Sequence, residues 1–188
     1  MEELIQWLCE IHPLSPECVA YLRRIIRRQK LRKNQLLLRE GEICKNIYFI
    51  KKGLLRCYYV RDGVEVTDWL FSEGDTVVSI NSFYDQRPGV DFIQALERCE
   101  LFYITYRQLQ TLFERYIEFN VVGRILTNKY LRVWHAQARN IRMLTAGQRY
   151  DLLMEQQPEL INRVPVQYLA SYLDMSKATL SRMRSRLN

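Results

Sequence analysis

The sequence of 188 residues contains none of the short motifs that often mark catalytic sites, because HExxH, GxSxG, P-loop and GxGxxG patterns are all missing. Its carboxylates show no paired spacing. It also has no run of about 18 uncharged apolar residues, the length that a membrane-spanning helix needs. We therefore predict that the protein is neither an enzyme nor a membrane protein.

Metal-binding patterns are equally scarce. The five cysteines are widely spaced and include no CxxC pair, which disfavours a disulfide framework or a zinc site and favours reduced packing thiols. His12 and His135 are too isolated to suggest haem or another metal. Glu2, Glu3 and Glu10 occupy a region where a secretory signal carries positive charge. We expect a soluble cytoplasmic protein with no metal and no other cofactor.

The composition nevertheless indicates a folded, basic protein. Hydrophobic residues make up 48% of the chain and aromatic residues 12%, enough to build a substantial core. Lys and Arg number 28 against 21 Asp and Glu, which gives a formal charge of +7. A polyanionic partner is compatible with this charge but does not follow from it, because basic proteins with other roles are common.

Turn signals at strand spacing mark the middle of the chain. Gly41, Gly53, Gly63 and Gly74 follow one another at intervals of 12, 10 and 11 residues, and short β-prone runs such as NIYFI and LLRCYYV lie between them. This regularity predicts an antiparallel barrel, sandwich or roll. Asp62-Gly63 is the clearest hairpin tip, since a two-residue primed turn needs positive φ at both positions.

After about Tyr106 the apolar period changes to that of a helix, with steps of three and four and no proline before Pro158. We predict a single helix that reaches about Arg139 and spans about 45 Å at 1.5 Å per residue. An apolar seam of this length favours pairing with a second copy, and Gly123 would allow two backbones to approach closely. A long core helix that lies across its own β domain is the alternative. The predicted dimer interface consists of Leu109, Leu112, Tyr116, Phe119, Gly123, Leu126, Tyr130 and Val133.

The first 30 residues are also expected to be helical, with interruptions near Pro13 and Pro16. Within them begins the stretch YLRRIIRRQKLRK, which places seven cations and no acid between residues 23 and 33. Two interpretations of this cluster stay open. It is either the solvated flank of a helix or a second surface that contacts phosphates.

The segment VPVQYLASYLDMSKATLSRMRSRLN, residues 164–188, predicts a helix, a turn and a second helix. Asp174-Met175 interrupts the helical pattern, and Ser176 is a natural N-cap whose hydroxyl accepts from the unpaired amides of the next turn. One face of the first helix is apolar, made up of Val166, Leu169, Ala170 and Leu173.

The second helix of this hairpin separates packing residues from polar ones. At 100° per residue Leu180, Met183 and Leu187 fall together, while the opposite side is small, polar and basic. Such a face fits a major groove about 12 Å wide, where Arg182 is placed to bond the O6 and N7 atoms of guanine. The alternative is a generic helical hairpin that is basic on one side for solubility. The predicted DNA contacts are Ser176, Lys177, Ala178, Thr179, Ser181, Arg182 and Ser185.

The order of these parts, together with the motifs REGE, YFIKKGLLR, FSEGD and LASYLDMSKATLSRMR, resembles the Crp/Fnr family of bacterial transcription regulators. The most specific piece is SKATLSR, in a family whose terminal signature runs roughly IASxLGxSxETLSRxxxxL. The similarity covers nearly the whole chain. It implies a homodimer that binds palindromic double-stranded DNA, an effector domain that tunes this binding and, in some members, recruitment of RNA polymerase.

The chain departs from that family in its effector cassette. Members that bind cyclic AMP hold the ribose with a Glu and the cyclic phosphate with an Arg-Ser pair, and these positions correspond to Ser79, Gly89 and Val90 here. A buried phosphate without a cation is costly, so cyclic AMP is disfavoured, although Arg87 would substitute if the loop shifted. A different effector, or none, stays open. The candidate effector pocket consists of Ser79, Ile80, Arg87, Gly89 and Val90.

Two positions of the C-terminal hairpin and the N-terminal cysteines also depart from patterns of the family. Ala178 replaces a Glu that many relatives use on cytosine, which predicts a different base preference, with the methyl group against a thymine. Asp174 replaces the usual turn Gly, a tolerable change because Asp visits the left-handed region more readily than most residues. The iron–sulfur branch needs an N-terminal cysteine cluster, which Cys9 and Cys18 alone do not form.

These features predict an α+β chain with four parts. They are N-terminal helices (1–30), an antiparallel β-roll of the cyclic-nucleotide-binding type (31–105), a long dimerisation helix (106–140) and a helix-turn-helix domain (141–188). The leading hypothesis is a homodimeric, sequence-specific DNA-binding transcription regulator that does not bind cyclic AMP. The alternative is a ligand-binding β-roll protein whose C-terminal hairpin mediates protein contacts.

Overall fold

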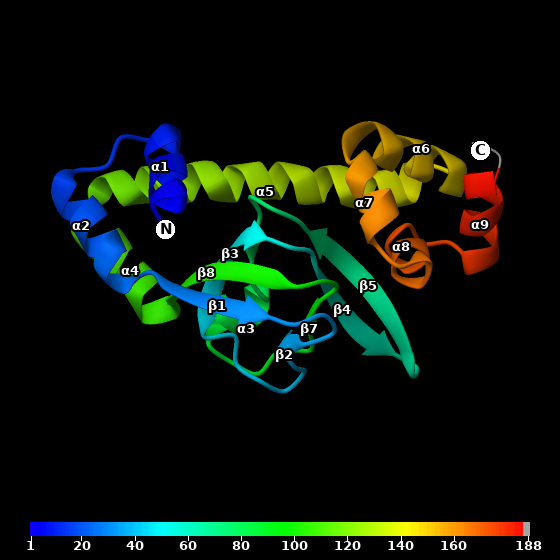
Figure 1. Cartoon of the computed structure of the whole chain (residues 1–188), viewed down its shortest axis with the longest axis horizontal. Helices are drawn as coiled ribbons and strands as arrows, with labels where there is room; N and C mark the ends of the chain where they lie inside the picture. Colours follow the sequence, from blue (N-terminus) through cyan, green and yellow to red (C-terminus); the bar gives the residue numbers. More distant parts are fainter. Residues whose placement is uncertain (186–188) are drawn as a thin grey trace.

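The computed structural model describes residues 1–185 and shows an α+β chain built around a β-roll, as the sequence predicts (Figure 1). The strands are β1 (Arg27–Leu31), β2 (Leu36–Leu38), β3 (Asn46–Lys52), β4 (Leu55–Arg61), β5 (Val64–Phe71), β6 (Thr76–Val77), β7 (Phe92–Ala95) and β8 (Cys99–Thr105). They form two antiparallel sheets of four strands each, in the orders β1-β8-β3-β6 and β2-β7-β4-β5.

The helices are α1 (Glu2–Ile11), α2 (Pro16–Ile25), α3 (Ile80–Asp85), α4 (Tyr106–Arg115), α5 (Ile117–Met143), α6 (Ala146–Gln156), α7 (Pro158–Arg163), α8 (Val166–Tyr172) and α9 (Lys177–Ser185). The long α5 runs along one side of the roll (Figure 1). Near its start lie α1, α2 and α4, whereas α6 to α9 gather at its far end. The C-terminal helices therefore lie far from the N-terminal ones.

The β4–β5 hairpin confirms the turn predicted from Asp62-Gly63. The φ angle is +53° at Asp62 and +77° at Gly63, so both residues take the positive values that a primed turn needs. Gly53, between β3 and β4, has a stricter role, since its φ is +111° and a Cβ there would lie 2.6 Å from the Sγ of Cys99 and 2.8 Å from the carbonyl oxygen of Arg98. Only glycine fits this corner without a shift of its neighbours.

The helical segment that follows β8 is broken at Tyr116, which corrects the prediction of one continuous helix. At this residue φ is −125° and ψ is 99°, between α4 and α5. The two helices pack on each other, and the ring of Phe113 lies 2.7 Å from the place that a Cβ of Gly123 would occupy. Gly123 therefore makes room for an aromatic ring of its own chain.

Three other segments differ from the sequence prediction. Residues 27–31 form the edge strand β1, so Arg27, Arg28 and Lys30 of the basic cluster lie on a strand and Arg32 and Lys33 in the turn after it, whereas Arg23 and Arg24 lie in the last turn of α2. The short helix α3, which follows β6, was not predicted. The short helix α7 was not predicted either, although it begins at Pro158, a favourable first residue for a helix.

The buried side chains form two clusters, and both include residues of the β-roll. The first cluster fills the roll and extends to α1, α2, α4 and α5, with Phe83 and Leu112 completely buried. The second cluster joins Leu54, Leu70 and Leu96 of the roll to the helices α6 to α9. The C-terminal helices thus share a core with the roll.

An open apolar groove lies between α5 and the sheet β1-β8-β3-β6. Its volume is about 330 Å³, and aromatic side chains such as Phe49 and Phe102 form part of its wall. Leu131 and Trp134 of α5 also line it, yet 61% of Leu131 and 39% of Trp134 are exposed. This stretch of α5 is therefore incompletely covered by its own chain.

Candidate nucleic-acid interface

The turn between α8 and α9 is a compact Schellman motif. The N–H of Met175 donates to the carbonyl of Ala170 at 3.0 Å, and the N–H of Asp174 donates to the carbonyl of Ser171 at 3.1 Å. Asp174 has a φ of +50°, the left-handed value that this motif requires at the position usually held by Gly. Backbone hydrogen bonds therefore fix the angle between the two helices.

The start and the inner face of α9 match the sequence prediction. The hydroxyl of Ser176 accepts the N–H of Thr179 at 3.1 Å, which makes it the N-cap. On the inner face Leu180 is completely buried in the second core cluster and Met183 is half-buried against it. Leu187, which was predicted for the same face, lies outside the described residues. The inner face anchors α9 to the rest of the protein.

The outer face of α9 is open. Lys177 donates to the side-chain oxygen of Gln167 at 3.4 Å, and the hydroxyl of Ser185 donates to the carbonyl of Arg182 at 3.0 Å. Within residues 1–185, no ion pair involves the Arg182 guanidinium. Thr179 is half-buried, and the other six predicted contacts are exposed: Ser176, Lys177, Ala178, Ser181, Arg182 and Ser185. Their contact with DNA stays a prediction.

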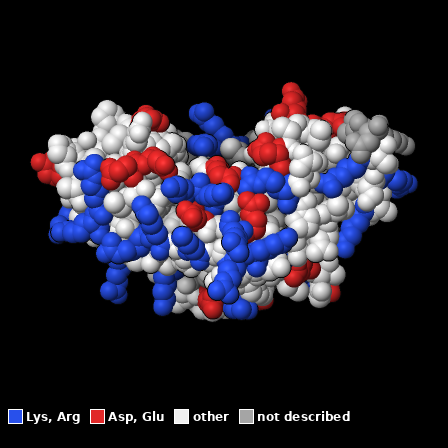
Figure 2. Space-filling model, in the orientation of Figure 1, with Lys and Arg blue, Asp and Glu red and all other residues white. Residues whose placement is uncertain are grey.

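Positive charge is not confined to α9. Figure 2 shows Lys and Arg spread widely over the visible face of the β-roll. The exposed cations of β1 and of the turn that follows it are Arg27, Arg28, Lys30, Arg32 and Lys33. Net charge alone therefore does not single out the reading helix, and its acid-free outer face on an anchored helix is the more specific signal.

Arg149 of α6 connects the α8–α9 turn to the end of α5. Its Nε donates to the carbonyl of Leu173 at 2.8 Å, and its Nη2 donates to the carbonyl of Asp174 at 2.9 Å. Its Nη1 donates to the carbonyl of Leu144 at 2.8 Å. A cation is favourable at such helix ends because the last carbonyls have no partner within the helix. The sequence did not reveal this residue, since all its partners are backbone atoms.

Three residues of the predicted dimer interface are buried within their own chain. Leu109 is 6% exposed, Leu112 0% and Phe119 6%, because these side chains pack into the core of their own chain. Over this stretch the apolar spacing of three and four residues therefore reflects packing against the chain's own core. The other five are more accessible, since Tyr116, Gly123, Leu126 and Tyr130 are half-buried and Val133 is exposed. The dimer interface as a whole stays a prediction.

The five residues of the candidate effector pocket lie at the start of α3 and in the loop that follows it, and their role as a pocket stays a prediction. Ile80 is the one that borders the apolar groove. Ser79 is 1% exposed and points elsewhere, to a carboxylate of the loop that follows α3. Arg87 and Val90 are exposed. The Oγ of Ser79 nevertheless lies 3.3 Å from the place that a Cβ of Gly89 would occupy, so these two residues are neighbours.

Comparison with known proteins identifies the architecture. Residues 28–116 match the family described as the cyclic nucleotide-binding domain. FixK2 from Bradyrhizobium japonicum superimposes with a TM-score of 0.73 at 18% identity, over 87% of this chain and 84% of that one. The c-di-GMP responsive global regulator CLP from Xanthomonas campestris gives 0.68 at 19% identity, over 92% and 91% of the two chains. The catabolite activator protein of Thermus thermophilus gives 0.57 at 19%, over 96% and 85%.

The chain has the Crp/Fnr fold. The resemblance noted in the sequence is thereby confirmed at the level of the fold, from the roll to the C-terminal helices. No curated protein sequence matches the chain. Within residues 1–185, no helix is both long and apolar enough to cross a membrane, and no group of three His, Cys, Asp or Glu residues is arranged to hold a metal ion.

In this Crp/Fnr fold the loop that corresponds to the family's phosphate-binding cassette is closed. The hydroxyl of Ser79 donates to the carboxylate of Asp91 at 2.5 Å. A Cβ at Gly89 would lie 2.9 Å from the Cβ of Ser82. The Ser82 hydroxyl in turn accepts the N–H of Cys44 at 2.9 Å. An acid and close packing thus occupy the loop that the resemblance places at the phosphate-binding cassette.

Proposed function

We propose that this chain is a sequence-specific DNA-binding transcription regulator that acts as a homodimer. The observation that carries the proposal is α9, a helix whose inner face is buried while its outer face is exposed, polar and free of acid. Arg182 on this face can form two hydrogen bonds with guanine, and Lys177 near the helix start can contact phosphates. We expect such a regulator to work in the cytoplasm, where it meets DNA and RNA polymerase.

The open groove beside α5 supports the homodimer. Its mouth exposes Leu131 and Trp134, and further along the helix Ile141 is 42% exposed. With 27 residues, α5 is about 40 Å long, which is enough for two copies to pair side by side. Such a pair has two-fold symmetry, so the two reading helices would enter major grooves about 34 Å apart on a palindromic operator.

The closed loop after α3 supports a regulator that does not respond to cyclic AMP. The carboxylate of Asp91 would repel a cyclic phosphate, and Ser79 already binds that carboxylate. A cation at Gly89 would need the backbone to move away from Ser82. Calorimetric titration should therefore show no saturable binding of cyclic AMP at micromolar concentration. Tight binding would contradict this part of the proposal.

Selection of bound sequences from random double-stranded DNA tests the function directly. We expect a palindrome, and we expect Arg182→Ala to lose about 1 to 3 kcal/mol of discrimination at one base pair of each half-site. The stability of the protein should not change, because the Arg182 side chain is exposed.

Arg61→Ala is the matched control, because it also removes one positive charge, from a side chain that is 77% exposed on the β4–β5 hairpin. It should weaken binding to all sequences slightly and leave discrimination intact. Equal affinity of the parent protein for selected and scrambled DNA would contradict the proposal. Salt-insensitive behaviour on DNA or heparin would favour the alternative in which the hairpin binds protein.

A further inference from the structure

An apolar contact holds the helix-turn-helix against the β-roll. Leu54 of the roll is completely buried, and Leu70 is 5% exposed, in the cluster that contains Leu169 of α8 and Leu180 of α9. The same residues that hold α8 and α9 together therefore also hold them against the roll.

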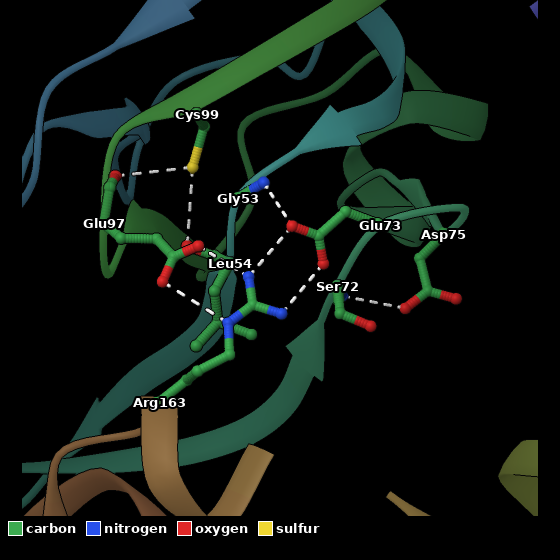
Figure 3. Close-up of polar contacts among 8 residues, drawn as sticks. All are labelled: Gly53, Leu54, Ser72, Glu73, Asp75, Glu97, Cys99 and Arg163. Carbon is green, nitrogen blue, oxygen red and sulfur yellow. Dashed lines mark hydrogen bonds and ion pairs between the residues drawn. The ribbon is translucent and has the colours of Figure 1, made fainter. Parts of the chain in front are cut away.

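Arg163, the last residue of α7, forms an ionic clamp on one side of this apolar contact (Figure 3). Its guanidinium reaches up between Glu73 and Glu97 of the roll and bonds both, at 2.9 Å and 2.5 Å. The Glu73 carboxylate also accepts the N–H of Gly53 at 2.8 Å. Such a planar fork between two carboxylates fixes direction as well as distance.

Arg56 of β4 forms a second clamp. It is 1% exposed, and its guanidinium carbon lies 3.9 Å from the ring centre of Tyr58 and 3.5 Å from that of Tyr168. Tyr168 belongs to α8, so the helix covers a buried cation of the roll. Glu65 binds the same guanidinium at 2.5 Å, and Gln94 accepts from its Nε at 2.9 Å. The two aromatic faces and the polar partners partly compensate the buried guanidinium for the water that it lacks.

A hydrogen bond from a backbone amide to a side chain also joins the edge strand β5 to α8. The N–H of Thr67 donates to the hydroxyl of Ser171 at 2.9 Å. This amide belongs to a strand edge that would otherwise offer unpaired groups to water or to another chain. All three contacts use α7 or α8, and none of them covers the outer face of α9. Docking to the roll is therefore compatible with DNA binding.

From this geometry we infer that Arg163 and Arg56 are positioning residues that fix the reading helix relative to α5 and so set the spacing of half-sites that the protein accepts. The inference rests on the proposed function. In a homodimer the two α9 helices are related through α5, and Arg149 ties the α8–α9 turn to the end of that helix. A rigidly held pair matches one separation of half-sites, whereas a loosely held pair tolerates several.

A series of operators tests this inference. The selected palindrome is lengthened or shortened at its centre by about one and two base pairs, each of which changes both the distance and the rotation between half-sites. The parent protein should lose about tenfold or more in affinity for each step away from the optimum. Arg163→Gln should weaken binding to the optimal operator about tenfold. It should also flatten the spacing profile, which means that its affinity should change less from one half-site spacing to the next.

The double variant Glu73→Gln with Glu97→Gln removes the same clamp from the other side. It makes the protein more positive, whereas Arg163→Gln makes it less positive, so a general charge effect on DNA binding would have opposite signs in the two variants. Both should flatten the spacing profile. Arg61→Gln is the matched control for lost charge and should keep the profile of the parent.

The second clamp has its own matched pair. Tyr168→Ala uncovers Arg56 and should flatten the profile, while Tyr168→Phe keeps the ring and should not. Amide exchange gives a readout that does not depend on DNA, because the Thr67 amide should lose protection in the clamp variants while amides in the centre of the roll keep theirs.

Two results would overturn the inference, and they are distinguishable. A parent protein that prefers a palindrome, with clamp variants that keep its spacing profile, removes the positioning role and leaves the proposed function intact. A parent protein that selects no sequence at all removes both.

Discussion

The β-roll contacts helices on both of its sheets, and the two contacts are complete to different degrees. Beside the sheet β2-β7-β4-β5, Leu54 and Leu70 are buried under α6 to α9, and the Arg163 clamp closes the edge. Beside the sheet β1-β8-β3-β6, a groove of about 330 Å³ stays open, and 61% of Leu131 is exposed at its mouth. The contact at the sheet β2-β7-β4-β5, called the finished contact below, is thus fully buried within the single chain, whereas the groove at the sheet β1-β8-β3-β6 stays open.

The two contacts should therefore contribute to different processes. The buried one contributes to folding of the single chain, and the open groove contributes to association. Side chains in the finished contact lose water when the single chain folds, so they contribute to its free energy of unfolding. Side chains at the mouth of the open groove keep their water until something covers them. Substitutions in the two regions should therefore change different measurements, and this expectation can be tested at each.

The largest effect is expected at the open groove. Leu131→Glu should weaken the homodimer about hundredfold or more, roughly 3 kcal/mol, because pairing would bury a carboxylate against apolar side chains. Analytical ultracentrifugation measures the dissociation constant. The unfolding of the monomer should change little, since Leu131 is exposed there.

Val64→Glu is the control for Leu131→Glu, because Val64 is 63% exposed on the β4–β5 hairpin and lies outside the groove. It should leave the dissociation constant unchanged. If Leu131→Glu dimerises as tightly as the parent protein, the two copies pair through another surface.

The next effect is expected in the finished contact. Leu70→Ala should lower the free energy of unfolding by about 2 to 4 kcal/mol, since it leaves a cavity between the roll and the C-terminal helices. Leu131→Ala, the same substitution in the open groove, should cost less than about 0.5 kcal/mol. Urea denaturation of both variants gives the comparison. Similar costs for the two would show that the two contacts do not differ in the single chain.

Much of the fold could be predicted because local signals were strong. Asp62-Gly63 predicted its hairpin, since two positive φ angles are accessible to few other residue pairs. The apolar period after Tyr106 predicted helix but not the break at Tyr116, where neither Pro nor Gly interrupts the sequence. At this break the ring of Phe113 packs against Gly123, a tertiary contact that an apolar period does not contain.

The candidate site was predictable where its residues are neighbours in the sequence. Ser176 as the N-cap and Asp174 as the left-handed turn residue follow from side-chain chemistry within a few positions. The partners of Arg163 are 66 and 90 residues away, so no spacing rule indicates them. Arg56 was overlooked for the same reason, since the covering ring comes from Tyr168.

A smaller effect on stability is expected when low pH protonates Glu73 at the finished contact. The Arg163 guanidinium, followed by the N–H of Gly53, lowers the pKa of Glu73 from 4.5 to about 2. Because the folded pKa lies below the unfolded one, the stabilisation is fully present above pH 4.5 and is lost as the pH falls towards 2. The loss should be modest, since 41% of the Glu73 side chain is exposed to water.

Unfolding measured between pH 6 and about pH 2 checks this expectation. The parent protein should lose more stability over that range than Glu73→Gln, which has no carboxyl group to protonate at this position. Equal pH dependence of the two proteins would mean that the ion pair adds nothing to the docking of the C-terminal helices.

The smallest effect is expected at the turn that sets the angle of α9. Asp174 has a φ of +50°, a conformation that L-residues adopt at some cost and glycine adopts freely. Asp174→Gly should therefore stabilise the protein by up to about 1 kcal/mol, while Asp174→Ala should destabilise it by a similar amount. Urea denaturation measures both. Since the Schellman hydrogen bonds use backbone atoms alone, Asp174→Gly should leave the position of α9, and hence any DNA spacing preference, unchanged. A loss of stability in Asp174→Gly would instead show that the carboxylate itself stabilises the turn by more than the strain it carries.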